Sequence, residues 1–267
     1  MHSTRRLIRW VAHAVGALRP AGAPEGLRIL LYHSIGGDVS AEPYNTSISP
    51  DLFREQMRWL RQDFAGDIVS LEEGIGRLRD GIRKPSVAIT FDDGYRDNLT
   101  IAGPILAAFK IPFTVFVTPS YVQSDRAGRD RYLTPDELRR MSCVSGASIG
   151  AHGYSHRPLT RLGKTELRHE LTDAKLYLEQ VIERPVMALS YPHGATNKRV
   201  REAARSAGYT LAATSLIGVN RSPATCLMLR RTEVLECDQM EQFQRKVRGD
   251  YDWYRIKQQL YWPLPRG

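Results

Sequence analysis

Short apolar runs alternate along this chain with longer segments in which apolar residues recur every three or four positions. The runs are typical of buried strands, and the longer spacing is typical of amphipathic helices. Strands are expected at residues 28–32, 86–90, 112–117, 147–151, 186–190 and 209–213, followed by an extended segment at 227–234. Helices are expected at residues 49–63, 70–81, 97–109, 164–183, 197–207 and 238–248, and one more begins at residue 134.

The order of these elements predicts the fold class. Ser49, Ser70 and Thr134 stand just before helical patterns, where their side chains can cap the first turn. Roughly seven strand-then-helix units in succession predict a parallel sheet, because parallel strands need crossover connections of helix length. We expect an α/β protein, a single distorted (β/α) barrel of about seven parallel strands over residues 27–267, preceded by a basic amphipathic segment and linker at residues 1–26.

Composition narrows the choice of partners. The chain has 267 residues, of which 42% are hydrophobic, as in an ordinary globular domain. Its net charge of +9 would attract anionic polymers or membranes, but we interpret many of the arginines as residues on solvated helix faces. No RNA-binding motif indicates a nucleic-acid partner. The three cysteines are widely spaced and predict neither a disulfide framework nor a thiolate metal site.

Residues 3–18 place apolar side chains at helical spacing opposite Arg5, Arg6 and Arg9. This pattern suits peripheral contact with an anionic membrane, and it equally suits a helix that packs across the domain. Arg9 and His13 interrupt the apolar stretch that a secretory signal needs, and no run approaches the roughly 20 apolar residues of a membrane span. A cytoplasmic or membrane-peripheral location is favoured and an extracytoplasmic one stays open, while the oligomeric state is not indicated.

Polar side chains follow the predicted strands at the points where the strands end. His33 follows the first strand, Asp92 and Asp93 the second, His152 the fourth, and the turn 191–194 the fifth. In α/β barrels the loops at the carboxyl ends of the strands open on one face, and that face holds the active site. We therefore expect these residues to converge at one mouth of the barrel.

Two pairs of these residues predict a metal ion. His152 and His156, in His-Gly-Tyr-Ser-His, have a spacing that lets two imidazoles reach one metal from a single helical turn, although surface histidines explain most such pairs. Asp92 and Asp93, in Thr-Phe-Asp-Asp-Gly, are adjacent anions that repel unless they share a cation. A surface turn would not usually follow an apolar run so directly. We expect Asp93, His152 and His156 to hold a divalent metal, with Asp92 left free as a base.

Two histidines and one carboxylate leave coordination positions open, as catalytic metal sites do. The chemistry that this arrangement suits is hydrolysis, in which the metal activates water and a carboxylate takes the proton. Cleavage of an amide also needs an acid for the departing nitrogen, and His33 is a candidate, although a histidine at a strand end is as often a hydrogen-bonded structural residue. Zn²⁺ is the expected cofactor, with Co²⁺ and Ni²⁺ as alternatives.

Three motifs in this order, Thr-Phe-Asp-Asp-Gly, His-Gly-Tyr-Ser-His and Tyr-Pro-His-Gly, resemble those of the polysaccharide deacetylases with a nodulation-protein-B homology domain, and the likeness covers residues 28–234. The resemblance implies a distorted barrel of about seven strands. It further implies Asp92 as the catalytic base and Asp93, His152 and His156 as metal ligands. The implied substrate is a carbohydrate containing N-acetylglucosamine, whose N-acetyl groups are removed by hydrolysis.

The catalytic histidine of most family members lies near the C-terminus, in a Leu-x-His motif. Here Leu31, Tyr32 and His33 supply that motif near the N-terminus. This order resembles a circularly permuted branch of the family that includes the biofilm poly-N-acetylglucosamine deacetylases. It supports His33 as the acid.

The sequence also departs from the family pattern. Gly153 stands where Ser or Thr often follows the first metal histidine, so one hydrogen bond of the loop is lost. Leu-Ser-Tyr-Pro-His-Gly occupies the place of an Arg-x-Pro-Tyr motif, so the arginine that holds the base is missing there. We hypothesise that Arg230 or Arg231 replaces it. The backbone N–H of His193 is a candidate donor to the oxyanion, and Tyr191 is a candidate for substrate contact.

The function predicted from the sequence is therefore metal-dependent removal of N-acetyl groups from an N-acetylglucosamine-containing oligo- or polysaccharide. Two alternatives stay open. The missing arginine would suit a barrel that binds carbohydrate without turnover, even though the base, the ligands and the acid are all present. A metal hydrolase of another amide or ester would need the same residues, because a fold does not fix its substrate.

Overall fold

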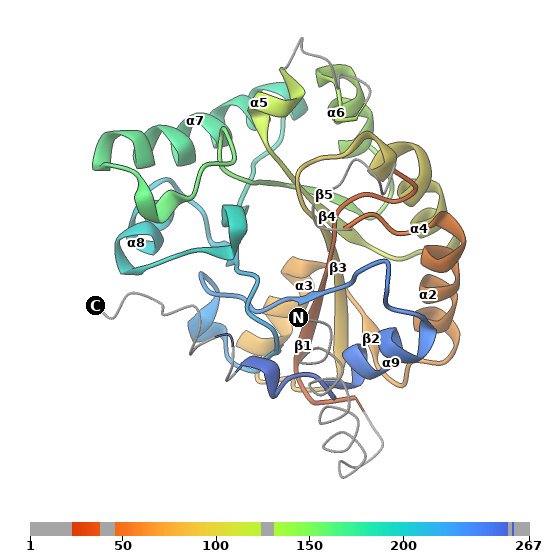
Figure 1. Ribbon diagram of the computed structural model, residues 1–267. Coiled ribbons are helices and arrows are strands. Elements are labelled where there is room, and N and C mark those ends of the chain that lie inside the picture. The colour runs from red at the N-terminus through yellow and green to blue at the C-terminus, as the bar shows by residue number, and fades with distance from the viewer. Residues whose placement is uncertain (1–22, 38–45, 124–130, 256–257, 259–267) are drawn as a thin grey trace, which may run out of the picture.

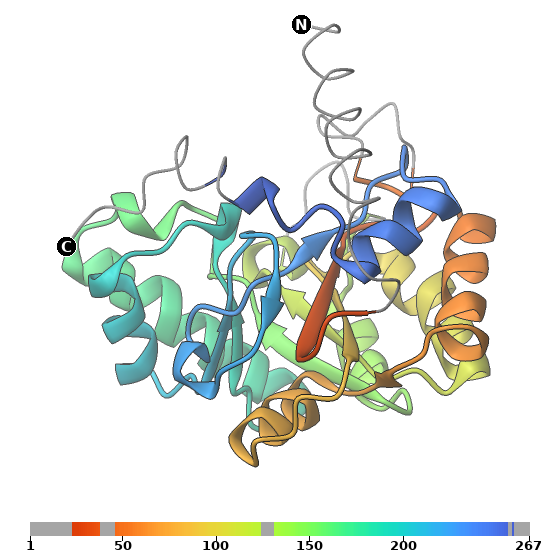
Figure 2. The same cartoon turned by 90° about the horizontal axis from the view of Figure 1, so that it is seen from below.

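The computed structural model describes residues 23–37, 46–123, 131–255 and 258. A mostly parallel sheet curls through the middle of the molecule, with helices around its outer side (Figure 1, Figure 2). The strand order is β7-β6-β5-β4-β3-β1-β8, where β2 also pairs with β3 and β9 with β1. The strands are β1 (Leu27–Tyr32), β2 (Asp67–Ile68), β3 (Ser86–Phe91), β4 (Phe113–Val117), β5 (Ala147–Ala151), β6 (Ala188–Ser190), β7 (Leu211–Ala213), β8 (Val219–Asn220) and β9 (Thr232–Glu233).

The helices begin at the capping residues that the sequence indicates. The side chain of Ser49 accepts a hydrogen bond from Leu52 N–H, and those of Ser70 and Thr134 cap their helices in the same way. The described helices are α2 (Pro50–Gln62), α3 (Leu71–Arg79), α4 (Gly103–Phe109), α5 (Pro119–Val122), α6 (Pro135–Ser142), α7 (Lys164–Ile182), α8 (Lys198–Ser206) and α9 (Met240–Arg248). The predicted helix at 97–109 differs at its start, where residues 98–102 form a π-helical turn before α4.

The barrel closes between β7 and β1 through the segment 229–233. Ala213 of β7 bridges Leu229, and Thr232 and Glu233 then pair with β1 as β9. The pairings between the described strands β1 to β9 are all parallel except that of β1 with β8. The prediction of a distorted, mostly parallel barrel is therefore confirmed, and the extended segment predicted at 227–234 forms its seam.

Apolar side chains fill the barrel and separate it from the surrounding helices. β1 and β3 are buried along their whole lengths, as expected for parallel strands covered on both faces. Inside the barrel, Leu27 and Ile29 of β1 pack with Leu71 and Ile75 of α3, so α3 covers the end where the strands begin. The opposite end, where the strands finish, is left for the loops that carry the polar residues.

Most of the predicted N-terminal segment, including the membrane-contact candidate at residues 3–18, lies outside the described residues. Within the described part of the chain, no helix combines the length and apolarity needed to cross a bilayer.

Candidate active site

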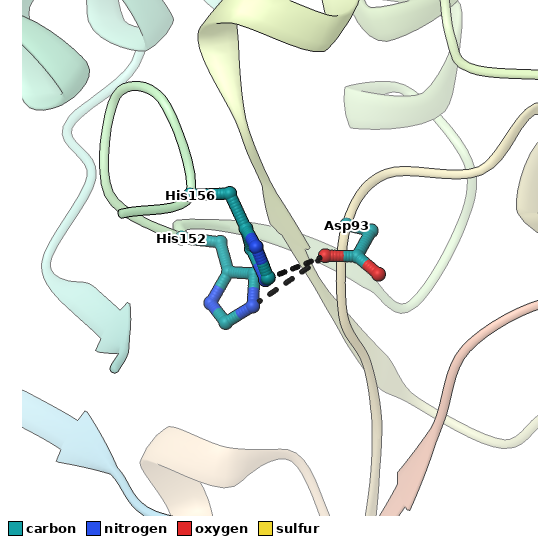
Figure 3. Close-up of side chains that lie close together, drawn as sticks. All are labelled: Asp93, His152 and His156. Carbon is teal, nitrogen blue, oxygen red and sulfur yellow. Dashed lines mark ion pairs between the residues drawn. The ribbon is translucent and has the colours of Figure 1, made fainter. Parts of the chain in front are cut away.

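The side chains of the two adjacent aspartates that follow β3 point in different directions. The backbone of Asp93 is left-handed, with φ of 73°, and that of Gly94 follows with φ of 77°. Aspartate tolerates this conformation better than most residues, and glycine adopts it freely. The sharp turn leaves Asp92 inside the barrel with 3% of its surface exposed, while Asp93 faces the histidine loop (Figure 3). The two carboxylates thus have separate partners.

Asp92 is held by Arg231, a residue of the barrel seam that is itself 1% exposed. The guanidinium donates two hydrogen bonds of 2.7 Å, one to each carboxylate oxygen, and a third of 2.8 Å to Ser190 Oγ, which in turn donates to Asp92 over 3.0 Å. Burial would raise the pKa of Asp92, but the charge of Arg231 holds that pKa well below its usual range. Arg231 therefore occupies the position of partner to Asp92, as hypothesised, and keeps the carboxylate ionised.

Asp93, His152 and His156 meet at one point (Figure 3). Asp93 Oδ1 lies 3.5 Å from His152 Nε2 and 3.4 Å from His156 Nε2, and it has no hydrogen-bond partner among the described residues. Ligands of a tetrahedral zinc ion with bonds of about 2.0–2.1 Å lie about 3.3 Å apart. A buried carboxylate oxygen left without a hydrogen bond at these separations fits a divalent metal, so these three residues can hold one.

The protonation states of both imidazoles agree with this fit. His152 Nδ1 lies 2.9 Å from the carbonyl oxygen of Ser190, so Nδ1 must carry the proton and Nε2 keeps its lone pair for a metal. Burial lowers the pKa of His152, and burial together with the charge of His193 lowers the pKa of His156 to about 4. Both rings are therefore neutral near pH 7, the form in which histidine binds metals.

The loop between the two histidines is not the helical turn that the spacing suggested. His156 has a left-handed backbone with φ of 59°, and the loop is held by Glu170 of α7, which accepts hydrogen bonds from Tyr154 N–H at 2.8 Å and Ser155 N–H at 3.0 Å. Gly153 is also left-handed, and a Cβ there would lie 3.2 Å from Glu170 Oε2. The carboxylate of Glu170 thus anchors the loop directly. No sequence pattern singles out Glu170, because it is one acidic residue among several on a long helix.

His33 lies at the end of β1 on the same side of the barrel. Its Nδ1 is buried and has no hydrogen-bond partner among the described residues, and its imidazole lies close enough to Asp92 and His156 to affect the pKa of both. Asn98 donates a 2.8 Å hydrogen bond to the carbonyl oxygen of His33 and a 3.0 Å bond to Asp97. The π-helical turn therefore fastens the backbone that carries His33.

Known proteins with similar sequences or structures bear on this arrangement. A family model described as Polysaccharide deacetylase matches residues 80–212, which include both aspartates and both histidines. The Bacillus subtilis protein YxkH, whose name places it among polysaccharide deacetylases, is 28% identical over 214 residues, or 79% of this chain and 72% of that protein. The deacetylase PplD of Streptococcus pyogenes, solved in complex with acetate, superposes with a TM-score of 0.74 at 27% identity over 84% of this chain and 99% of that one. This chain belongs to the polysaccharide deacetylase family.

A staphylococcal relative adds detail on the branch of the family. The poly-β-1,6-N-acetyl-D-glucosamine N-deacetylase of Staphylococcus aureus is 26% identical over 167 residues, which are 59% of this chain and 57% of that protein. Deacetylases of this kind are hydrolases of carbon–nitrogen bonds, which confirms the predicted enzyme class. The resemblance to the biofilm deacetylases is likewise confirmed.

Tyr191, which the sequence made a candidate for substrate contact, is bonded to the protein on all sides that its contacts describe. It is fully buried, its hydroxyl donates a 3.0 Å hydrogen bond to the carbonyl oxygen of Leu227, and its N–H donates to that of Ala213. The side chain fixes the seam. His193, two residues on, is exposed and left-handed, with φ of 59°, and its ring packs edge-on against His156 with centroids 4.6 Å apart.

We predict that stability changes with pH through Asp97. Burial raises the pKa of Asp97 to about 6, against hydrogen bonds from Ser34, Ile35 and Asn98. Because the pKa of Asp97 is higher in the folded state, protonation of its side chain favours folding. This contribution is complete below the unfolded pKa of about 3.9 and is lost as pH rises through about 6. Between pH 4 and pH 7, wild type should therefore lose on the order of 2 kcal/mol of unfolding free energy relative to Asp97→Asn. Urea unfolding at both pH values measures the difference, and a constant difference would contradict the prediction.

Proposed function

We propose that this chain removes N-acetyl groups from an N-acetylglucosamine-containing oligo- or polysaccharide, with a divalent metal, most simply Zn²⁺ and alternatively Co²⁺ or Ni²⁺. The observation that carries the proposal is the separation of the two aspartates. Asp92 is paired with Arg231, whereas Asp93 faces two neutral histidines. Membership of the family and the polysaccharide named for the staphylococcal deacetylase support the choice of substrate.

In this proposal Asp93, His152 and His156 hold the metal. When bound there, a divalent ion supplies a Lewis acid that polarises a carbonyl oxygen and makes water more acidic. The hydrogen bond from His152 Nδ1 to the carbonyl oxygen of Ser190 keeps the imidazole in the orientation that a metal ligand needs.

Asp92 and His33 then share the proton transfers. Asp92 takes a proton from the attacking water as the oxygen of that water bonds to the acetyl carbon. His33 gives a proton to the sugar nitrogen as the carbon–nitrogen bond breaks, so that acetate and a free amine leave. The backbone N–H of His193 is our candidate donor to the negative oxygen that forms at the acetyl carbon, because its turn packs against the ligand His156.

A screen of acetate release tests the proposal. Purified protein would be assayed on chitooligosaccharides, peptidoglycan fragments and poly-N-acetylglucosamine, with metal content measured on the same preparation. We expect release from at least one of these and dependence on bound metal. Binding of the sugars without release of acetate under any divalent metal would contradict it, and release only from other amides or esters would reassign the substrate. The observation that favoured a non-catalytic barrel, the missing arginine, no longer does so, because Arg231 is paired with Asp92.

Replacing His156 with Ala should remove bound metal. The substitution deletes one of three ligands, so metal affinity should fall by more than about 100-fold, beyond the 10–100-fold typical when only an outer partner of a ligand is lost. Metal content after dialysis against a weak chelator measures the effect. His169→Ala is the matched control, because that histidine is 68% exposed on α7 and pairs with Asp173. Equal metal content in His156→Ala and wild type would exclude this ligand set.

A further inference from the structure

A cavity lies beside the candidate active site. It has a volume of about 240 Å³ and is lined by residues from the end of β7, the barrel seam and the C-terminal segment, among them Ser215, Arg231, Glu233, Trp253 and Tyr254. The C-terminal segment is tied to the end of β7 by Gln258, which accepts a 2.9 Å hydrogen bond from Ile217 N–H and donates to Ser215 O over 3.3 Å. The cavity is thus part of the folded barrel mouth.

Two of the residues that line this cavity also contact groups of the candidate active site. Arg231 lines it and at the same time holds Asp92 through two 2.7 Å hydrogen bonds. Ser215 lines it and packs against Gly194 of the His193 turn, so closely that a Cβ on Gly194 would lie 2.5 Å from Ser215 N. A ligand in the cavity would therefore lie next to the groups that surround a reacting acetamide.

The lining chemistry favours a neutral, hydroxylated ring. The rings of Trp253 and Tyr254 lie at 80° to one another with centroids 5.8 Å apart, and Trp253 Nε1 is buried without a hydrogen-bond partner among the described residues. Aromatic rings take the apolar face of a sugar, and an unpaired indole N–H offers a donor to a hydroxyl.

The two cationic side chains that line the cavity, Arg231 and Lys246, do not favour an anionic ligand. Lys246 donates to the carboxylate of Asp238 and, over 2.8 Å, to the carbonyl oxygen of Glu233. Arg231 is paired with Asp92. Both positive charges are therefore already balanced by protein groups. The cavity is also smaller than the roughly 300–1,000 Å³ of pockets for drug-sized ligands, so it suits one sugar ring rather than an oligosaccharide.

We infer that this cavity is a subsite for a sugar residue next to the one that is deacetylated, and that Trp253 determines a preference for longer chains. The inference rests on the proposed function, since it assumes a polymer of N-acetylglucosamine as substrate. A dimer would leave the subsite empty in at least one of its binding registers, whereas a tetramer can fill the active site and the subsite together.

The test compares kcat/KM on β-1,4- and β-1,6-linked N-acetylglucosamine tetramers and dimers. Wild type should prefer the tetramer, and Trp253→Ala should lower the tetramer-to-dimer ratio by about tenfold, the size expected for loss of a ring-stacking contact. Trp253→Phe keeps a ring and should retain most of the ratio. Leu176→Ala, at a 58% exposed position on α7, is the control for a surface change. An unchanged ratio in Trp253→Ala overturns the inference.

Two further arms separate this inference from the proposed function. If Trp253→Ala fails to fold, as judged by its thermal unfolding, Tyr254→Ala replaces it in the same assay with the same expected loss. If wild type releases no acetate, the proposed function fails, and calorimetric titration of the tetramer then decides the subsite. Weaker tetramer binding by Asp92→Asn/Trp253→Ala than by Asp92→Asn supports it, and equal binding overturns it.

Discussion

Asp92→Asn is expected to lower kcat/KM for acetate release by about 10²–10⁴-fold while bound metal is retained. The amide cannot take a proton from water, so the attacking oxygen loses its base. The metal should stay because Asp93, His152 and His156 converge without Asp92, whose nearer oxygen lies 3.7 Å from His152 Nε2. Steady-state kinetics and metal analysis on one preparation measure both effects.

The control for this substitution is Asp51→Asn, the same chemical change on a carboxylate whose side chain is 97% exposed. It should leave both activity and metal content at wild-type values. Wild-type turnover by Asp92→Asn would mean that another group is the base. Loss of metal together with activity would instead make Asp92 a ligand, and the division of roles between the two aspartates would be wrong.

Arg231→Met is expected to lower the free energy of unfolding by about 3–5 kcal/mol, because it leaves the buried carboxylate of Asp92 without its countercharge. Activity should fall as well. With the arginine gone, burial raises the pKa of Asp92, so the acidic limb of the pH–activity profile should move to higher pH. Urea unfolding and a pH series of kcat/KM measure the two effects.

The neighbouring arginine offers a matched control. Arg230 packs its side chain against Gly218 and its N–H donates to Asn220 Oδ1, so Arg230→Met should change stability by less than about 1 kcal/mol and leave the pH profile in place. The double variant Asp92→Asn/Arg231→Met removes both charges and should be more stable than Arg231→Met alone, yet inactive. If Arg230→Met destabilises as much as Arg231→Met, or if the double variant is no more stable, the buried pair is not the source of the effect.

The strand and helix pattern predicted the barrel and the end of it at which the polar residues lie. A short apolar run such as residues 86–90 predicts a strand that is buried on both faces. The capping residues Ser49 and Thr134 mark where helices start, because their side chains hydrogen-bond to backbone only three residues away. Because parallel strands all finish at one end, the order of motifs also predicted that Asp93, His152 and His156 meet.

Contacts between distant segments could not be predicted in this way. The sequence left Arg230 and Arg231 as alternatives, and it offered no sign that Glu170 anchors the histidine loop. It also suggested Tyr191 as a substrate contact, whereas in the structure the Tyr191 hydroxyl donates a hydrogen bond to the carbonyl oxygen of Leu227. Each of these interactions depends on the orientation of one side chain across the barrel, which no local pattern records.

What the sequence by itself determined is the set of chemical groups and the mouth of the barrel that carries them, since hydrophobic periodicity and capping act over a few residues. The tertiary structure alone decided the pairings. The seam between β7 and β1 brings Arg231 to Asp92, 139 positions away, and Ser190 bridges the two. Such a buried ion pair forms only where the fold removes water and fixes both partners, so packing selects the arginine that holds the base.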